Sequence, residues 1–143
     1  MMKINESLGY LIGLTNRHMK RELDNKLKEF NITTSQFACL KLLSEEEKSL
    51  TQVEIAARLK SDKVTAGAVI DKLIDKGLVS RERNIKDKRA YVIQITDNGL
   101  SVVKDTVGSA VAVNRKALKG LSEEEVDSIV FLLNKINKNF MEE

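Results

Sequence analysis

The chain has 143 residues, of which 42% are hydrophobic and 31% are charged, and its formal net charge is +3 at pH 7. This length is enough for one hydrophobic core and too short for two independent ones, and no long uncharged apolar run is present that could cross a bilayer. The first residues lack the apolar region and cleavage site of a secretory signal, which predicts a cytoplasmic protein. One cysteine and one histidine exclude an internal disulfide and a zinc cluster of His and Cys within one subunit. We therefore expect no metal and no other cofactor.

The positive charge is concentrated in the middle of the chain. Residues 51–96 contain ten Lys and Arg against six Asp and Glu, whereas residues 97–143 contain six against eight. Such a basic segment is compatible with a solvated surface as well as with nucleic-acid binding, so the charge supports a nucleic-acid partner without deciding for it.

The first 27 residues carry apolar side chains at steps of three and four, which predicts one long amphipathic helix. The stripe consists of Ile4, Leu8, Leu11, Ile12, Thr15, Met19, Leu23 and Leu27. A second helix is predicted after Thr33, because Thr33 and Gln36 stand at the spacing of a capping box.

Two further helices have the spacing of a helix-turn-helix motif. Thr51 and Glu54 form another capping box and open a short helix, and a polar turn over residues 60–62 follows it. The next helix is predicted from about Lys63 to Lys76. It ends at Gly77, because a residue without Cβ adopts the left-handed conformation freely. The second helix of such a unit enters the major groove of DNA.

A basic hairpin is predicted over residues 78–96, LVSRERNIKDKRAYVIQIT. Its two halves alternate apolar and polar residues on either side of a charged loop, as two paired strands would. A basic hairpin behind a helix-turn-helix pattern is typical of a winged DNA-binding module.

Two helices are predicted after the hairpin, one with apolar positions from Leu100 to Leu118 and one from about Ser122 to Phe140. The fold class is thus mainly α with a small β-hairpin wing, in the order α-α-α-α-β-β-α-α. The terminal helices carry more apolar surface than a compact core of this size needs, so we expect them to pair with a second copy of the chain. A two-fold dimer would place two recognition helices about 34 Å apart on one side of a duplex.

On these motifs the chain resembles the MarR family of winged-helix regulators. The resemblance covers nearly the whole chain and includes LTQVEIAARL, VIDKLIDKGLVSRE and DKRAYVIQITDNG, with Asp87-x-Arg89 as its most specific part. It implies a single domain over residues 1–143, with a winged core at about 33–96 and dimerisation helices at about 3–29 and 97–141. It also implies a homodimer that binds a roughly palindromic double-stranded operator. Such a dimer usually represses genes until a small molecule or an oxidant lowers its DNA affinity.

The resemblance also implies roles for individual residues. Arg89 would insert into the minor groove, where a narrow A·T-rich groove attracts arginine, and Asp87 would orient it. Ser61, Lys63 and Thr65 would contact phosphates and base edges, and lysines 72, 86 and 88 would add salt-sensitive affinity. The complete set of expected DNA contacts is Thr51, Gln52, Ser61, Asp62, Lys63, Thr65, Ala66, Ala68, Lys72, Arg83, Lys86, Asp87, Lys88 and Arg89.

The recognition helix departs from related proteins over residues 65–68, Thr-Ala-Gly-Ala, where long polar side chains are absent. Such a face offers few bidentate base contacts, so we expect specificity to depend on the wing, on DNA shape and on A·T content. Gly67 should also weaken the helix by about 1 kcal/mol relative to alanine.

Three residues are candidates for sensing an effector: Arg17, His18 and Cys39. Cys39 could act as an oxidant sensor in a repressor, although a buried, unreactive thiol is the alternative reading. His18, beside Arg17, could lie near an effector pocket or be an exposed helix residue. No nucleophile elbow, phosphate loop or metal-ligand spacing indicates an enzyme. A winged-helix protein used for protein or nonspecific nucleic-acid contact remains the competing function.

Overall fold

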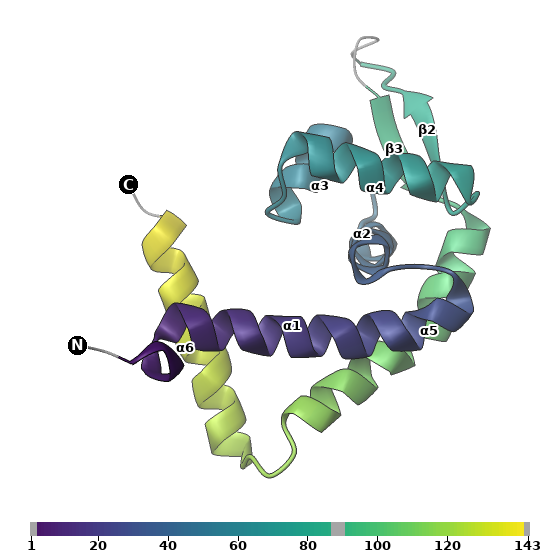
Figure 1. The fold of residues 1–143 in the computed structure, drawn as a ribbon. Helices are drawn as coiled ribbons and strands as arrows, with labels where there is room; N and C mark the ends of the chain where they lie inside the picture. The colour runs from purple at the N-terminus through teal and green to yellow at the C-terminus, as the bar shows by residue number, and fades with distance from the viewer. Residues whose placement is uncertain (1–2, 87–90, 142–143) are drawn as a thin grey trace.

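The computed structural model describes residues 3–86 and 91–141 and confirms the predicted fold class, mainly helical with a small antiparallel sheet. The helices are α1 (Leu8–Leu27), α2 (Thr34–Glu45), α3 (Gln52–Arg58), α4 (Lys63–Asp75), α5 (Asp97–Ala117) and α6 (Glu123–Met141), with short 3₁₀ turns at Ile4–Glu6 and Lys28–Phe30. The strands are β1 (Leu50–Thr51), β2 (Val79–Arg83) and β3 (Tyr91–Ile95). In Figure 1, α2 lies between α1 and α4, and the β2–β3 hairpin projects beyond α4.

Two details of the sequence prediction were wrong. Ile4 lies in a separate 3₁₀ turn, because Ser7 is extended (ψ 125°) and α1 begins only at Leu8. The short strand β1 was missed, since two residues are too few to show an alternation. Leu50 pairs with Ile93 and Thr51 with Val92, which gives a three-stranded sheet in the order β1-β3-β2.

The predicted helix starts are confirmed as capping boxes. Thr33 Oγ1 accepts from the Gln36 backbone N–H at 3.2 Å, and Gln36 Oε1 accepts from the Thr33 N–H at 3.1 Å. The pairs Thr51–Glu54 and Ser122–Glu125 form the same reciprocal bonds. Each box satisfies backbone donors that the first turn of a helix would otherwise leave unpaired.

The end of α4 also follows the prediction. Gly77 has φ +72°, its N–H donates to Ile74 O, and the Leu78 N–H donates to Leu73 O at 3.0 Å. This pair of bonds is the Schellman motif, which brings the residue beyond the glycine back against the last turn of the helix. Both Leu73 and Leu78 are buried in the core, so the turn directs the chain from α4 straight into β2.

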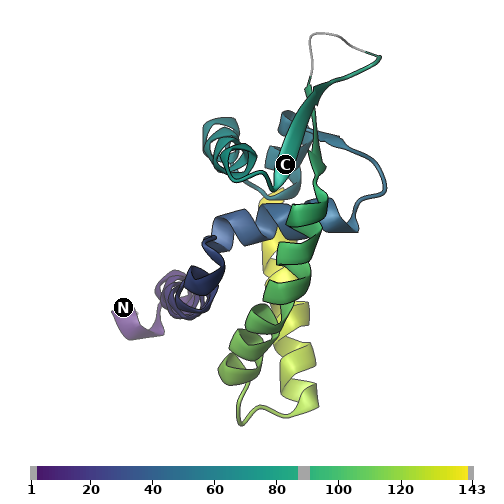
Figure 2. The same cartoon turned by 90° about the vertical axis from the view of Figure 1, so that its right-hand side faces the viewer.

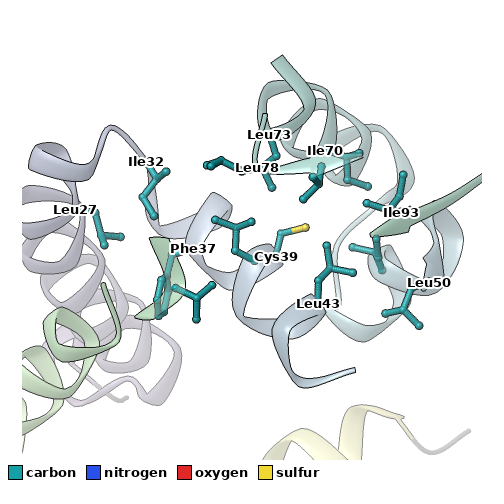
Figure 3. Close-up of a cluster of buried hydrophobic side chains, with 14 residues drawn as sticks. Leu27, Ile32, Phe37, Cys39, Leu43, Leu50, Ile70, Leu73, Leu78 and Ile93 are labelled. Carbon is teal, nitrogen blue, oxygen red and sulfur yellow. The ribbon is translucent and has the colours of Figure 1, made fainter. Parts of the chain in front are cut away.

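The core lies where α2, α3, α4 and the sheet meet the inner ends of α1 and α5. Its side chains include Leu27, Ile32, Phe37, Cys39, Leu40, Leu43, Leu50, Ile55, Ile70, Leu73, Leu78, Val79, Ile93 and Val103. Figure 3 shows this cluster, with Cys39 among the apolar side chains of the core. The core therefore holds the winged unit together and leaves the far ends of the terminal helices outside it.

Helix α6 contributes no buried residue. Figure 1 shows α5 and α6 as the two arms of a V, and in the turned view of Figure 2 α6 (yellow-green) passes behind α5. Large apolar side chains remain exposed on α6, among them Ile129, Val130, Phe131, Leu132, Leu133 and Phe140. In the described part of the chain, no helix combines the length and the apolar character needed to cross a membrane.

Candidate nucleic-acid interface

The turn between α3 and α4 is built so that the N-terminus of α4 is exposed. Lys60 takes a left-handed conformation (φ 54°) and thereby ends α3. Asp62 is the N-cap of α4: its carboxylate accepts from the Thr65 N–H and from the Thr65 hydroxyl, both at 2.7 Å. These bonds lower the pKa of Asp62, since they stabilise its charged form. The predicted contacts Asp62 and Thr65 thus bond to each other, and Asp62 shapes the helix start.

The orientation of α4 shows that one predicted DNA contact, Ala66, is wrong. Ala66 is only 3% exposed and lies on the same side of the helix as Ile70 and Leu73, so its methyl group is not available to a groove. Ala68 and Lys72 are exposed, and their role as DNA contacts stays a prediction. Residues 65–68 are contiguous in sequence but do not share one face, because helical periodicity directs residue 66 inward.

Val64 is the residue of this face that the sequence analysis missed. It is 84% exposed, although it is a β-branched apolar residue in the first turn of α4. A valine here has no packing partner in the core, and it stands next to Lys63 at the exposed helix start. Its position four residues before Ala68 could have identified it, because residues at that spacing share a face.

Arg81 joins three elements at the edge of this surface. Its guanidinium Nη2 lies 3.0 Å from Asp71 Oδ1 on α4 and 3.4 Å from Gln52 Oε1 at the start of α3. The Gln52 side chain in turn lies over Gly67, where an added Cβ would approach Gln52 Nε2 to 2.7 Å. Arg81 and Asp71 were not predicted as site residues, because their pairing depends on how β2 packs against α4.

The wing continues from Arg81 along paired strands. Arg83 pairs with Tyr91 across the ladder, and the guanidinium carbons of Arg81 and Arg83 lie 5.9 and 5.5 Å from the centre of the Tyr91 ring. Arginine over an aromatic ring is held by cation–π attraction, which orders two cations on one side of the hairpin. Lys86 is exposed beyond them. Asp87, Lys88 and Arg89 lie outside the described residues.

The remaining predicted contacts lie at the starts of α3 and α4. Thr51 is the N-cap of α3 and Gln52 its first residue, while Ser61 is half-buried in the turn before α4. The structure thus brings together the start of α3, the first half of α4 and the base of the wing. It does not bring the three effector candidates together.

Arg17 and His18 are exposed on α1. A hollow of about 310 Å³ lies between α1 and α5, lined by His18, Met19, Glu22, Val113, Lys116 and Ala117. Lys116 donates to Glu22 Oε1 at 2.5 Å across this hollow. The Lys116 hydrogen bond lowers the pKa of Glu22. His18 therefore borders a polar and apolar hollow, whereas Arg17 does not line it.

Cys39 lies away from this hollow, in the centre of the core. Its side chain is fully buried, and burial raises the pKa of the thiol to about 11 from an ordinary value of 9.0. Because the thiolate is the species that reacts with oxidants, this environment favours the unreactive alternative. Over residues 3–86 and 91–141, no group of three His, Cys, Asp or Glu residues is arranged to hold a metal ion.

Comparisons with known proteins agree with this geometry. The model of the MarR family matches residues 32–91. A MepR–DNA complex from S. aureus is 28% identical, with a TM-score of 0.87 over 93% of this chain and 98% of that one. The reduced form of MarR from E. coli is 30% identical, with a TM-score of 0.76 over 91% of this chain and 96% of that one. A mutant of MarR from E. coli bound to operator DNA is 28% identical, with a TM-score of 0.84 over 90% of this chain and 92% of that one.

Proposed function

Because the chain belongs to the MarR family of DNA-binding transcriptional regulators, we propose that it is a homodimeric repressor of a roughly palindromic operator, released by a small molecule. The observation that carries this proposal is the exposed first half of α4 beside a wing base whose arginines are ordered by Tyr91. The proposal treats the chain as one domain, with the winged core at about residues 33–96. In this proposal the protein acts on DNA in the cytoplasm and catalyses no reaction.

Helix α4 is the element that enters the major groove. Its N-terminus is capped by the Asp62 carboxylate, and the exposed Lys63 beside it supplies the positive charge that suits a phosphate. Val64 and Ala68 offer methyl groups one turn apart, which suits contacts with thymine methyls. This surface carries few donors and acceptors, and specificity then depends strongly on A·T content and on DNA shape.

The wing follows the DNA backbone into the adjacent minor groove. Arg83 and Lys86 lie on the described part of the hairpin, and the sequence continues with Asp87, Lys88 and Arg89. We assign Arg89 to the minor groove, Asp87 to the orientation of Arg89, and the lysines to phosphates. Lysine contacts of this kind add affinity that falls as salt rises and is insensitive to sequence.

The dimer forms through the terminal helices. Ile4, Leu8 and Leu11 are 73%, 56% and 42% exposed at one end of the molecule, and α6 has no buried residue. Apolar surface of this extent on a water-soluble chain is stabilised by a partner. A two-fold axis there repeats α4 on the second half of an inverted repeat.

Release by an effector uses the hollow between α1 and α5. It lies beside the dimer helices and offers the His18 imidazole, the Lys116 ammonium and apolar walls. Its lining also carries the Glu22 carboxylate, which pairs with Lys116, so an uncharged molecule with polar and apolar parts fits this hollow better than an anion does. Occupation would shift α1 against α5 and thereby change the separation of the two α4 helices.

The first test is selection of duplexes by the purified protein from a random pool, at two salt concentrations, followed by sequencing. An enriched inverted repeat of about 16 to 20 base pairs, with affinity that falls steeply with salt, is the expected result. Retention without an enriched motif would indicate nonspecific binding. No retention at either salt concentration would favour a protein-contact role and contradict the proposal.

Arg89→Ala tests the wing on the enriched operator. We expect binding to weaken by about 1 to 3 kcal/mol per contact, with a loss of preference for A·T pairs at the wing position. Fluorescence anisotropy titrations at fixed salt measure the effect, and Lys104→Ala on α5 removes an equal charge outside the interface as a control. Unchanged affinity and preference would show that the wing does not read the operator.

A further inference from the structure

The C-terminal end of α4 is tied to the junction between α1 and α2 by one lysine. Lys76 Nζ donates to the carbonyl oxygen of Asn31 at 2.5 Å and to Gln36 Oε1 at 2.9 Å. Lys76 is the C-cap residue of α4, whereas its acceptors lie 45 and 40 residues earlier in the chain. The side chain therefore crosses from the recognition helix to the segment that follows the dimerisation helix.

The acceptors of Lys76 are themselves held in place. Asn31 has a left-handed backbone (φ 58°), and its N–H donates to Lys28 O at 3.0 Å. Gln36 is 7% exposed, and its Oε1 also accepts from the Thr33 N–H within the capping box of α2. A buried amide that accepts two hydrogen bonds is a fixed point, because either bond restrains its rotation.

The same junction is bonded to α1. Asp24 Oδ1, on α1, accepts from the Thr34 N–H at 2.7 Å, at the first residue of α2. A continuous series of polar contacts thus runs from α1 through the start of α2 to the end of α4. Figure 1 shows these three helices as successive layers, with α2 in the middle.

We propose that Lys76 is a positioning residue that holds α4 at a fixed angle to α1 and thereby sets the half-site separation accepted by the dimer. This inference rests on the proposed function, in which α1 belongs to the dimer interface and α4 to the major groove. The reading end of α4 lies 13 residues from Lys76, about 20 Å along the axis at 1.5 Å per residue. A small tilt at the tied end is therefore amplified at the bases, and the two-fold axis applies it to both half-sites.

The test uses the enriched operator in a series of duplexes whose two half-sites are moved apart or together in single base pairs. Wild-type protein should bind one separation best. Lys76→Met should bind that duplex less selectively, so that its affinity ratio between the best and the neighbouring separations falls by about 2- to 30-fold. Lys76→Arg keeps a charged donor and should retain most of the wild-type ratio.

Lys72→Met is the matched control, because it removes the same charge from the exposed face of the same helix. It should weaken binding at every separation and leave the ratio unchanged. Gln36→Met removes an acceptor of Lys76 and should lower the ratio as Lys76→Met does. If Lys76→Met does not fold, as judged by circular dichroism and sedimentation, Lys76→Gln replaces it with a polar, uncharged side chain.

These measurements distinguish a failure of the positioning role of Lys76 from a failure of operator binding. An unchanged ratio in Lys76→Met, or an equal loss of affinity at all separations, would overturn the positioning role and leave operator binding intact. A wild-type protein that enriches no inverted repeat would overturn the proposed function, and the role of Lys76 with it.

Discussion

Gly99 shows how a single residue constrains the join between the sheet and α5. A Cβ at this position would overlap the carbonyl oxygen of Leu78, and it would come within 2.6 Å of Ile95 Cγ1. The Leu78 carbonyl accepts from the Thr96 N–H at 3.1 Å, so it is not free to move away. The glycine is required here by close approach of backbone to backbone.

We predict that Gly99→Ala destabilises the protein by about 1–3 kcal/mol, the usual cost of overpacking. Gly108→Ala is the control on the same helix, since nothing lies within 4 Å of its added Cβ. That substitution should stabilise by up to about 1 kcal/mol through helix propensity. Urea unfolding followed by circular dichroism, at one fixed protein concentration, measures both. If both substitutions changed the free energy of unfolding in the same direction, the close approach at Gly99 would be contradicted.

Cys39 leads to a prediction about reactivity. A pKa of about 11 in place of 9.0 leaves about 100-fold less thiolate at neutral pH, and burial adds a barrier to access. Native protein should therefore react with iodoacetamide at least about 100-fold more slowly than protein in urea. Mass spectrometry over time gives the rates. Fast labelling of the native protein, with loss of DNA binding after peroxide, would instead support the oxidant-sensing alternative.

The position of the wing relative to α4 depends on the Arg81–Asp71 pair. Asp71 is a carboxylate on the outer side of α4, where it would repel phosphates if it lacked a counter-ion. Arg81 supplies that charge from β2 at 3.0 Å, with its side chain 36% exposed. The pair thus contributes to the interface in two ways, by neutralising Asp71 and by holding the hairpin against α4.

We predict that Arg81→Gln weakens operator binding and that Asp71→Asn in the same chain restores part of the loss. The expected coupling energy is about 0.2–1 kcal/mol, as for other solvent-exposed ion pairs. A double-mutant cycle of operator affinities measures it. The pairing would be contradicted if the two substitutions had additive effects on the free energy of operator binding. If Arg81→Gln also lowered the salt dependence of binding equally with and without Asp71→Asn, Arg81 would be a direct phosphate contact instead.

At the scale of the whole molecule, α6 has no buried residue, so substitutions on this helix test dimer formation directly. Its exposed apolar residues include Ile129, Leu133 and Phe140, and also Phe131 and Leu132, which are 64% and 52% exposed. Apolar residues therefore cover more than one face of α6. A helix of this kind is buried against more than one neighbour.

We predict that Ile129→Glu combined with Leu133→Glu yields a monomer that fails to bind the operator, since both changes would bury charges in the dimer interface. Asn134→Glu, on another face of the same helix, should remain dimeric. Sedimentation velocity over a range of concentrations measures the assembly state. A doubly substituted protein that stays dimeric would place the interface elsewhere.

Local patterns in the sequence determined where most of the helices begin, although not α1, and which faces are apolar. The boxes at Thr33, Thr51 and Ser122 and the Schellman turn at Gly77 involve bonds between residues at most five positions apart. Such bonds follow from short-range residue order alone, which is why the fold class and the helix-turn-helix were predictable. The wing residues Asp87, Lys88 and Arg89 stay predictions from the sequence.

The tertiary structure decided what depends on contacts between distant residues. Strand β1 exists because Leu50 pairs with Ile93, Arg81 meets Asp71 because β2 packs beside α4, and Lys76 reaches Asn31 across 45 residues. The burial of Ala66 and Cys39 likewise depends on which elements cover them. Which distant residues meet depends on the angles at which the helices and strands pack, and the whole core sets these angles. The sequence therefore determined the DNA-reading unit, and the packed fold determined how that unit is held.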